Sequence, residues 1–262
     1  MRKTLALTAI YVLLFQICRA EIVPRQIIVK RGPVAAGGGA ANSFAYQAYD
    51  YALESASSRT SFNTANLPAV TAGWNALACA RWSVSGSPAM QAPTSSGDTW
   101  TLIPATLATD ASAAAYECAY ATGLSSAANK TVTFNFSPGA TFAAGVVIYF
   151  SSTSTPTLDA AVIGTSSTGT SFTSPSFSTT NGSGTDAGII IACGTANNAS
   201  LTWTAGNIGG SASDLRFPHP PAISIGDMGC ETLTVASAQS SITAAISISS
   251  SFAGRLGAVS FK

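Results

Sequence analysis

The sequence predicts an all-β protein that folds as an antiparallel β-sandwich. Short stretches of alternating apolar and polar residues recur along the chain, and clusters of glycine, proline, serine and asparagine separate them, as in strands joined by turns. No helical periodicity longer than about two turns occurs after residue 20. The chain also combines an N-terminal export signal with cysteines further along, which is typical of an extracellular fold held by disulfides.

The clearest strand lies at residues 69–84, AVTAGWNALACARWSV. Successive side chains of an extended chain point to opposite faces, so the alanines share one face with Trp74 and Trp82. Leu77 and Cys79 lie on the other face. Read as a helix, the same residues would have no polar face and no capping residue. We therefore predict a central strand whose tryptophans fill space at its two ends.

The other strands follow from the same patterns. TVTFNF at 131–136 alternates and predicts a half-buried strand. GVVIYF at 145–150 and GIIIAC at 188–193 are apolar throughout, so these strands are expected to be covered on both faces. The full set of further strands is predicted at residues 44–55, 98–103, 112–121, 130–136, 141–150, 160–165, 171–179, 188–193, 201–204, 231–235, 241–249 and 255–261.

Residues 1–20 are predicted to be a secretory signal peptide. Arg2 and Lys3 precede an apolar stretch that is too short for a comfortable membrane span. Only 9% of all residues are charged and the formal net charge is +1, whereas about 25% is usual in soluble domains. This composition gives no electrostatic basis for binding nucleic acid. We expect a secreted protein, extracellular or at the cell surface, with no membrane span in the mature chain.

Residues 21–43 are predicted to hold a separate N-terminal strand, centred on Ile27, Ile28 and Val29, and then a glycine- and alanine-rich linker. The β-sandwich domain is predicted to occupy residues 44–262. The N-terminal strand is interpreted as an extra edge strand or a disordered terminus. Alternatively, it completes the sheet of a neighbouring subunit, because exposed strand edges recruit other strands.

Removal of Cys18 with the signal peptide leaves four cysteines, an even number that indicates two disulfides in an exported chain. They are not spaced as C-x-x-C pairs and the chain has a single histidine, so neither a metal site nor a cofactor is predicted. Two of them lie in the two most apolar strands, which favours a bridge between central strands. Among the three connectivities, we predict Cys79–Cys193 and Cys118–Cys230.

The chain carries in succession VTAGWNALACARW, GDTWTLI, AAAYECAYATG, NKTVTFNF, VVIYFSSTSTPTLDAA and AGRLGAVSFK. This succession resembles an immunoglobulin-like β-sandwich module of exported bacterial surface and repeat proteins and of phage-associated proteins. The resemblance covers residues 44–262 and is most specific at 97–102 and 131–159. It implies an immunoglobulin-like or jelly-roll-like sandwich outside the cell, and it transfers no site residues because most such modules have no assigned activity. The chain differs from these modules in its added cysteines and in residues 207–230.

Residues 207–230 contain prolines and glycines that predict a long surface loop. The single histidine, His219, lies between two of these prolines, with Asp214 and Asp227 in the same segment. A Ser-His-Asp hydrolase would need His219 as its base. Since no nucleophile motif or carboxylate pair accompanies it, we predict no catalytic residues, and an exported hydrolase using His219 is an alternative only.

Aromatic residues suggest a second alternative. Tyr46, Tyr49 and Tyr51 gather in the first strand of the sandwich, and Trp203 lies in a later one. Such rings usually pack a sheet, but exposed rings also stack on sugars, which would give a carbohydrate-binding module with a polysaccharide partner. The leading prediction is a secreted, non-enzymatic structural or adhesive protein that self-assembles, as in a filament, through its N-terminal strand or binds a cell-surface partner.

Overall fold

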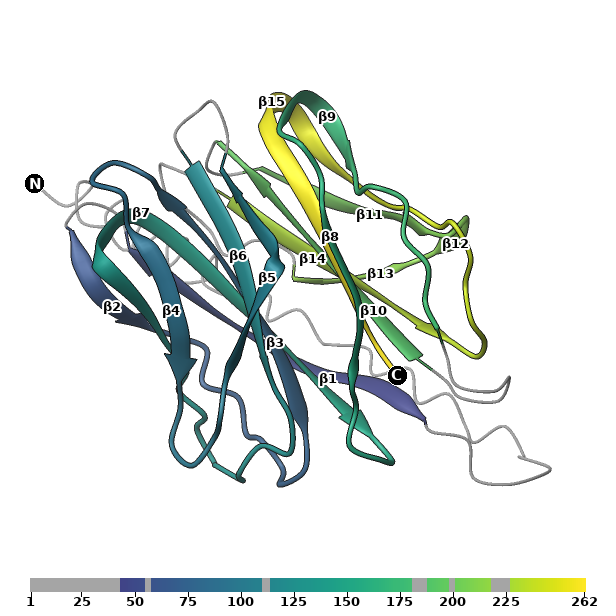
Figure 1. Cartoon of the computed structure of the whole chain (residues 1–262), viewed down its shortest axis with the longest axis horizontal. Coiled ribbons are helices and arrows are strands. Elements are labelled where there is room, and N and C mark those ends of the chain that lie inside the picture. The colour runs from purple at the N-terminus through teal and green to yellow at the C-terminus, as the bar shows by residue number, and fades with distance from the viewer. Residues whose placement is uncertain (1–42, 55–57, 110–113, 181–187, 198–200, 218–226) are drawn as a thin grey trace, which may run out of the picture. The chain divides into compact units, whose positions relative to one another are not determined.

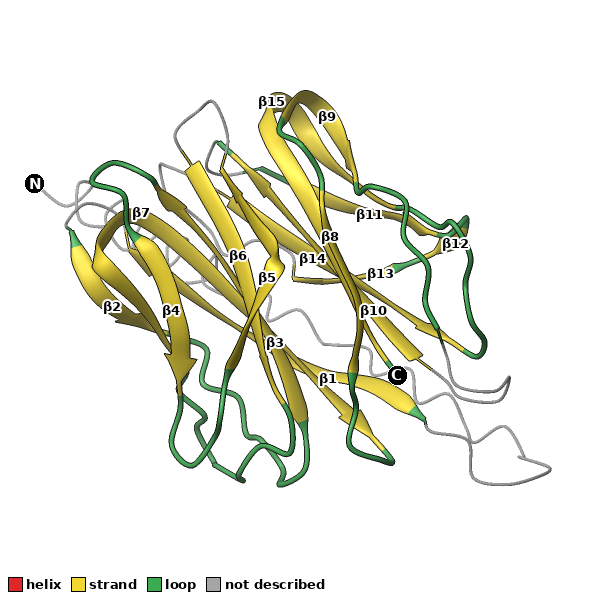
Figure 2. Ribbon diagram, viewed as in Figure 1, coloured by secondary structure: helices red, strands yellow, loops and turns green. Residues whose placement is uncertain are grey.

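A computed structural model describes residues 43–262 apart from 55–57, 110–113, 181–187, 198–200 and 218–226. The predicted signal peptide, the linker and Ile27, Ile28 and Val29 lie outside the described residues. The described part belongs to one unit, Ala41–Lys262. It consists of strands and loops without a helix, and its two antiparallel sheets pack against each other (Figure 1, Figure 2). The predicted all-β sandwich is confirmed.

The first sheet comes from the N-terminal half of the described chain, coloured purple to teal in Figure 1. Its strands are β1 (Phe44–Glu54), β2 (Arg59–Asn63), β3 (Asn75–Ser83), β4 (Ala89–Thr94), β5 (Thr101–Thr109), β6 (Ala114–Ala121) and β7 (Thr133–Ser152). The second sheet follows, from teal-green to yellow. Its strands are β8 (Leu158–Ile163), β9 (Ser167–Thr173), β10 (Gly188–Ala196), β11 (Trp203–Ile208), β12 (Ser211–Ala212), β13 (Asp214–Phe217), β14 (Asp227–Val235) and β15 (Ala244–Phe261).

The two sheets repeat one pairing scheme. In the first, the order is β1-β7-β3-β6-β5, and β2 and β4 pair with the N-terminal part of β7. In the second, β8, β15, β10, β14 and β13 pair in the same order, and β9 and β11 pair with the N-terminal part of β15. The two-residue strand β12 is an addition. The chain therefore contains two successive copies of one strand arrangement, called here the first and second repeats.

The central strands are covered on both faces. In β3, the alanines and Trp82 belong to a core inside the first repeat, while Leu77 and Cys79 belong to a core between the two sheets, called the central core. This confirms the alternation predicted for residues 69–84. In β10 every residue is buried. Ile189 faces the central core and Ile190 faces the core of the second repeat, which explains why the sequence of this strand is apolar throughout.

Two pairs of predicted strands are single long strands. The predictions at 130–136 and 141–150 fall on β7, which continues through Ser137, Pro138 and Gly139, and those at 241–249 and 255–261 fall on β15. These segments carry turn-forming residues and so predict a break. In the fold, β7 pairs with β2 and β4 before this point and with β1 and β3 after it. Ladder hydrogen bonds on both sides hold the chain extended.

Four short strands have no counterpart in the sequence prediction. They are β2 and β4, together with β12 and β13, which lie inside the segment 207–230 that we expect to be a loop. In β2 only Phe62 is buried, and most residues of β4 are exposed. Edge strands that bury so little need no regular alternation of apolar and polar residues, so periodicity does not reveal them.

Candidate functional site

Both disulfides join directly opposed residues on neighbouring strands of one sheet. Cys79 of β3 faces Cys118 of β6, with an S–S distance of 2.09 Å and a Cα–Cα distance of 4.0 Å. Cys193 of β10 faces Cys230 of β14, with distances of 2.12 and 4.1 Å. The four predicted cysteines form two disulfides, but the predicted pairing is wrong. The sequence places the cysteines on apolar strands without showing which strands are neighbours, and a disulfide needs its two Cβ atoms to lie about 3.5–4.5 Å apart.

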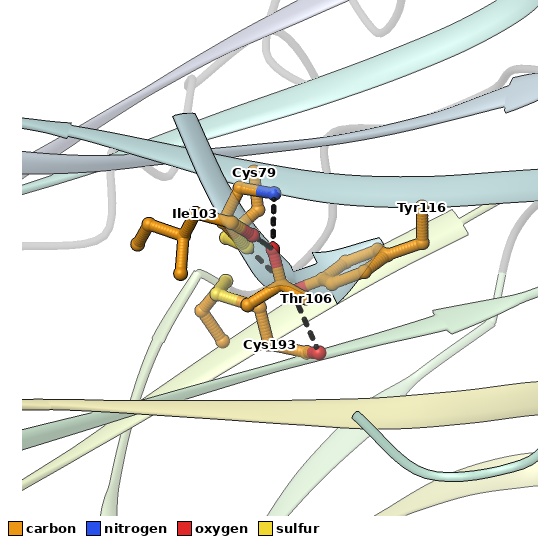
Figure 3. Close-up of a disulfide and its surroundings, with 7 residues drawn as sticks. Cys79, Ile103, Thr106, Tyr116 and Cys193 are labelled. Atoms are coloured by element: carbon orange, nitrogen blue, oxygen red, sulfur yellow. Dashed lines mark hydrogen bonds between the residues drawn. A yellow bond between two sulfur atoms is a disulfide. The ribbon is translucent and has the colours of Figure 1, made fainter. Parts of the chain in front are cut away.

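The two disulfides occupy equivalent positions in the two repeats, and both lie in the central core. Polar side chains fit around them (Figure 3). Thr106 of β5 donates to the carbonyl of Ile103 (2.7 Å) and accepts from the amide of Cys118 (2.8 Å). Tyr116 of β6 reaches across the central core, and its hydroxyl donates to the carbonyl of Cys193 (3.4 Å). Buried polar groups near the disulfides thus find partners within each sheet and between the sheets.

A bulge places the tyrosines of β1 on one face. The register between β1 and β7 shifts between Tyr46 and Ala48, so Gln47 is an extra residue and the alternation restarts after it. As a result Tyr46, Tyr49 and Tyr51 all pack, half-buried, against the central core. Without the bulge, Tyr46 would point to the opposite face from the other two.

The edge strand β13 of the second sheet covers these tyrosines. The guanidinium of Arg216 lies 4.5 Å from the centroid of the Tyr46 ring. The ring of Phe217 lies 5.3 Å from that of Tyr49 and 5.9 Å from that of Tyr51. Burial raises the pKa of the Tyr46 hydroxyl to about 12, an effect that Arg216 opposes. The rings predicted to stack on sugars therefore already contact protein groups of the facing sheet.

Trp203 lies in the core of the second repeat and is only 3% exposed. Its ring packs on the backbone of Gly229, where no Cβ would fit beside the indole. Phe172 covers it from another side, with 6.4 Å between the ring centroids. The indole has no face open to a sugar, contrary to the prediction for this residue. The apolar surface that predicts a stacking platform is used for packing instead.

A buried ion pair lies where two loops of the first repeat meet. Asp98 lies between β4 and β5, and Lys130 lies between β6 and β7. The Nζ atom of Lys130 is 2.5 Å from Oδ2 of Asp98, and the two side chains are 2% and 1% exposed. A pocket of about 620 Å³ adjoins the pair, and Lys130 contributes to its lining together with four serines and three threonines. This pocket and the ion pair form the candidate functional site.

Each oxygen of the Asp98 carboxylate accepts hydrogen bonds. Oδ1 accepts from the backbone N–H of Ser125 (2.8 Å), and the Ser125 hydroxyl lies 2.7 Å from the carbonyl oxygen of Ser96 and 2.9 Å from Oδ1. Oδ2 accepts from the hydroxyl of Ser95, which itself accepts from Nε1 of Trp100 (2.9 Å). Burial acts to raise the pKa of Asp98, but the hydrogen bonds from Lys130, Ser95 and Ser125 outweigh it and lower that pKa. The carboxylate is therefore well solvated by the protein itself.

Lys130 is surrounded by oxygen atoms in the same way. Besides Asp98, its Nζ donates to the carbonyls of Ser96 (3.3 Å) and Ser125 (3.2 Å) and to the Ser125 hydroxyl (2.9 Å). A serine beside a lysine suggests a nucleophile and its base, but a lysine acts as a base only when it is neutral. Here Nζ is held by the Asp98 carboxylate at 2.5 Å and by the carbonyls of Ser96 and Ser125. The geometry orders two loops rather than activating Ser125.

Neither Asp98 nor Lys130 belongs to a motif that predicts a site from the sequence. In a chain with 9% charged residues, each aspartate and lysine is a candidate for a specific contact. Their proximity still depends on how the loops converge, and the sequence does not show this.

His219, the base of the alternative hydrolase, lies outside the described residues. The structure does describe the two aspartates considered as its partners. Asp214 pairs with Arg216, with 2.6 Å between Oδ2 and Nη2. Asp227 is buried, and its carboxylate accepts from the backbone N–H of Leu201 (3.1 Å). Both carboxylates thus have structural partners, and the hydrolase stays an untested alternative.

In the part of the chain that the structure describes, no three His, Cys, Asp or Glu side chains come together in a way that could hold a metal ion. The same residues form no helix with the length and hydrophobicity needed to cross a membrane.

Comparison of the chain with protein-family models, with curated proteins and with solved structures gives no match. The resemblance to immunoglobulin-like modules therefore stays a prediction, and the function has to be argued from the residues themselves.

Glu117 of β6 is expected to make the stability of the protein depend on pH. The residue is 6% exposed, and burial raises the pKa of its carboxyl to about 7. Between the ordinary pKa of a glutamate and this value, the folded state holds the proton more tightly than the unfolded state. The free energy of unfolding should therefore fall as the pH rises from about 5 to about 8, by about 1–2 kcal/mol from this residue.

Urea unfolding of the wild type and of Glu117→Gln across that pH range measures this effect. The amide of glutamine does not titrate, so the free energy of unfolding of the variant should fall less as the pH rises. The variant should therefore be more stable than the wild type at the alkaline end of the range. Parallel pH profiles for the two proteins would show that Glu117 titrates normally.

Proposed function

We propose that this chain is an exported, non-enzymatic β-sandwich with a structural or adhesive role outside the cell. The observation that carries the proposal is the pair of buried cross-strand disulfides, one in each repeat. Disulfides persist in oxidising compartments and are rare in reducing ones. Their equivalent positions indicate that each repeat is stabilised separately, which suits a protein whose function is to keep its shape.

The chemistry of the surface supports the same proposal. The strand β9 exposes mainly hydroxyl side chains, and Phe172 is its buried residue among serines and threonines. A surface of this kind is hydrated with little charge, and β-branched threonine also favours the extended conformation. Such a surface suits contact with neutral partners, such as glycans or other copies of the chain, rather than with nucleic acid.

The proposed assembly uses Ile27, Ile28 and Val29 as a donated strand. The β1 edge of the first sheet is partly closed, because the backbone N–H of Ala65 donates to the carbonyl of Tyr51 (2.8 Å) and the Asn66 side chain donates to that of Tyr49 (3.1 Å). At the opposite edge, β5 pairs with β6 and with no other strand among the described residues. It exposes Leu107 by 53%. An edge of this kind is the natural acceptor for an added strand.

Deletion of residues 21–34 from the mature protein is expected to abolish filaments or oligomers seen by negative-stain microscopy and light scattering. Replacing Ile27, Ile28 and Val29 together by aspartate should have the same effect, since charged side chains do not pack on a sheet edge. Replacing the neighbouring Lys30 and Arg31 by alanine is the matched control and should leave assembly intact. Assembly that survives the deletion would refute the donated strand.

A further inference from the structure

We propose that the faces by which the two repeats pack on each other also join separate copies of the chain, so that the first repeat of one copy packs on the second repeat of another. The first reason is the symmetry of the contact. In the sheets, β8 and β13 of the second repeat have the positions of β1 and β5 in the first. β5 contacts β8, and β13 contacts β1. Two repeats that face each other in this way are arranged like the subunits of a symmetric dimer.

The equivalence extends to the residues that line the central core. Cys79 in β3 has the position of Cys193 in β10, and Cys118 in β6 has the position of Cys230 in β14. When the strands are aligned on these cysteines, the other core residues also fall at matching positions. The matching positions are Leu77 and Ile191, Ile103 and Phe217, Tyr116 and Met228, Ile148 and Val259, and Phe150 and Phe261. The two inner faces are therefore versions of one surface.

One pair of matching contacts differs in side-chain size. Gly257 of β15 lies against the ring of Tyr116, and a Cβ atom on this glycine would be 3.0 Å from Cε1 and 3.1 Å from the hydroxyl. The matching positions hold Val146 in β7 and Met228 in β14, both in the central core. A first repeat that met another first repeat would press Tyr116 against Val146, and overpacking of this kind is destabilising. The inner face of the first repeat therefore selects a second repeat as its partner.

A hydrogen bond adds to this selectivity. The hydroxyl of Tyr116 donates to the carbonyl of Cys193 across the central core (3.4 Å). Met228 stands at the matching position of the second repeat, and its side chain has no hydrogen to donate. A pair of second repeats would therefore lack this hydrogen bond, and the best-matched pair is one first repeat with one second repeat.

The repeats can separate without losing their own folds. Among the described strands, every ladder joins strands of the same repeat, and each disulfide closes within one repeat. Each repeat also has a core of its own besides the central core. Residues 153–157 connect β7 to β8, and an extended segment of this length spans about 17 Å. A chain that opens at this connector offers both inner faces to other copies.

Exchange of repeats gives the chain a route to assembly that differs from the donated strand, because it needs no residue of the segment 21–34. Within one chain, the connector favours pairing of its own two repeats by keeping them close together. Between copies, the same contact joins unlike faces. Such contacts either close into a dimer or continue from copy to copy as a filament, and the second outcome suits the structural role proposed above.

Two full-length variants test the exchange. Gly257→Val places a side chain against Tyr116 of its own chain, and Tyr116→Met leaves a gap opposite Gly257 of its own chain. If the two variants exchange repeats, the new methionine lies opposite the new valine, as at the positions of Met228 and Val146, and the unchanged tyrosine lies opposite the unchanged glycine. Neither variant alone can form a matched pair.

The two variants are unfolded in urea with their disulfides intact, mixed in equal amounts and refolded, with one of them isotope-labelled. Light scattering should give twice the mass of the monomer, and native mass spectrometry should show one labelled and one unlabelled chain in each dimer. Each variant refolded alone should not form this dimer. A mixture that contains no mixed dimer would overturn the proposal.

Three controls make the result specific. The double variant Tyr116→Met/Gly257→Val has a matched pair within one chain, so it should regain the stability that Gly257→Val loses even if that single variant does not fold alone. Gly169→Val alters a glycine of β9 whose Cβ would have no neighbour closer than 3.7 Å, and with Tyr116→Met it should give no mixed dimer. The original pair of variants without residues 21–34 should still form the mixed dimer. A mixed dimer that is lost with this deletion would belong to the donated strand and would refute the exchange.

Discussion

Replacing Cys193 and Cys230 together by alanine is expected to lower the free energy of unfolding by about 2–4 kcal/mol. The disulfide closes a loop with a sequence separation of 37 residues, and without it the unfolded chain gains conformational freedom. Both positions are buried in the central core, so the alanine side chains cannot form a new contact at the surface that would replace the lost disulfide. Guanidinium unfolding of the oxidised proteins, followed by tryptophan fluorescence, measures the change.

The Cys79→Ala and Cys118→Ala double variant is the matched comparison. Its disulfide closes a loop with a separation of 39 residues at the equivalent position of the first repeat, so the chain-entropy model predicts nearly the same loss. If the two losses differ widely, packing around the disulfides matters more than loop closure. A negligible loss in both variants would contradict the stabilising role on which the proposed function rests.

The strands that pack in the centre of the fold could be predicted because burial on both faces leaves a strong pattern. In β3, the alanines and Trp82 alternate with Leu77 and Cys79, and the two sets belong to different cores. In β10, isoleucines fill both faces. The cysteine pairing could not be read in the same way. It depends on β6 lying beside β3 and β14 beside β10, and neighbours in a sheet are set by tertiary contacts.

The long strand β7 shows where local signals mislead. Ser137, Pro138 and Gly139 are turn formers, yet they lie within a continuous strand. A strand tolerates proline at a position where no carbonyl of a neighbouring strand needs a hydrogen bond from its N–H. The repeat organisation could not be predicted from the sequence for a related reason. The two repeats share their pairing scheme and the positions of their disulfides, while the side chains that fill their cores differ.

The candidate site was harder to predict than the fold. The tyrosines of β1 are visible as a cluster in the sequence, but whether their faces are free depends on the bulge at Gln47 and on the approach of β13. Asp98 and Lys130 lie on separate loops, and their contact is a product of the folded arrangement. No alternation or motif in the sequence indicates that two residues of this kind are in contact.

Removing one member of the buried pair is expected to have the largest effect on stability. Asp98→Ala leaves the Lys130 side chain, which is 2% exposed, without its counter-charge. An unpaired buried charge costs about 3–5 kcal/mol. Urea unfolding near neutral pH measures this loss. The matched variant Asp159→Ala breaks the pair with Lys262, which is 34% exposed, and should cost about 0–1 kcal/mol.

The double variant Asp98→Ala/Lys130→Met separates charge from packing. Once the ammonium is also removed, nothing charged remains buried at the site, and the apolar side chain can fill part of the space. The double variant should therefore be more stable than Asp98→Ala alone, although it lacks both partners. If the two losses simply add, the ammonium of Lys130 is not desolvated in the variant, and the two loops must open to water when Asp98 is removed. The pair would then contribute to stability through loop packing rather than through charge.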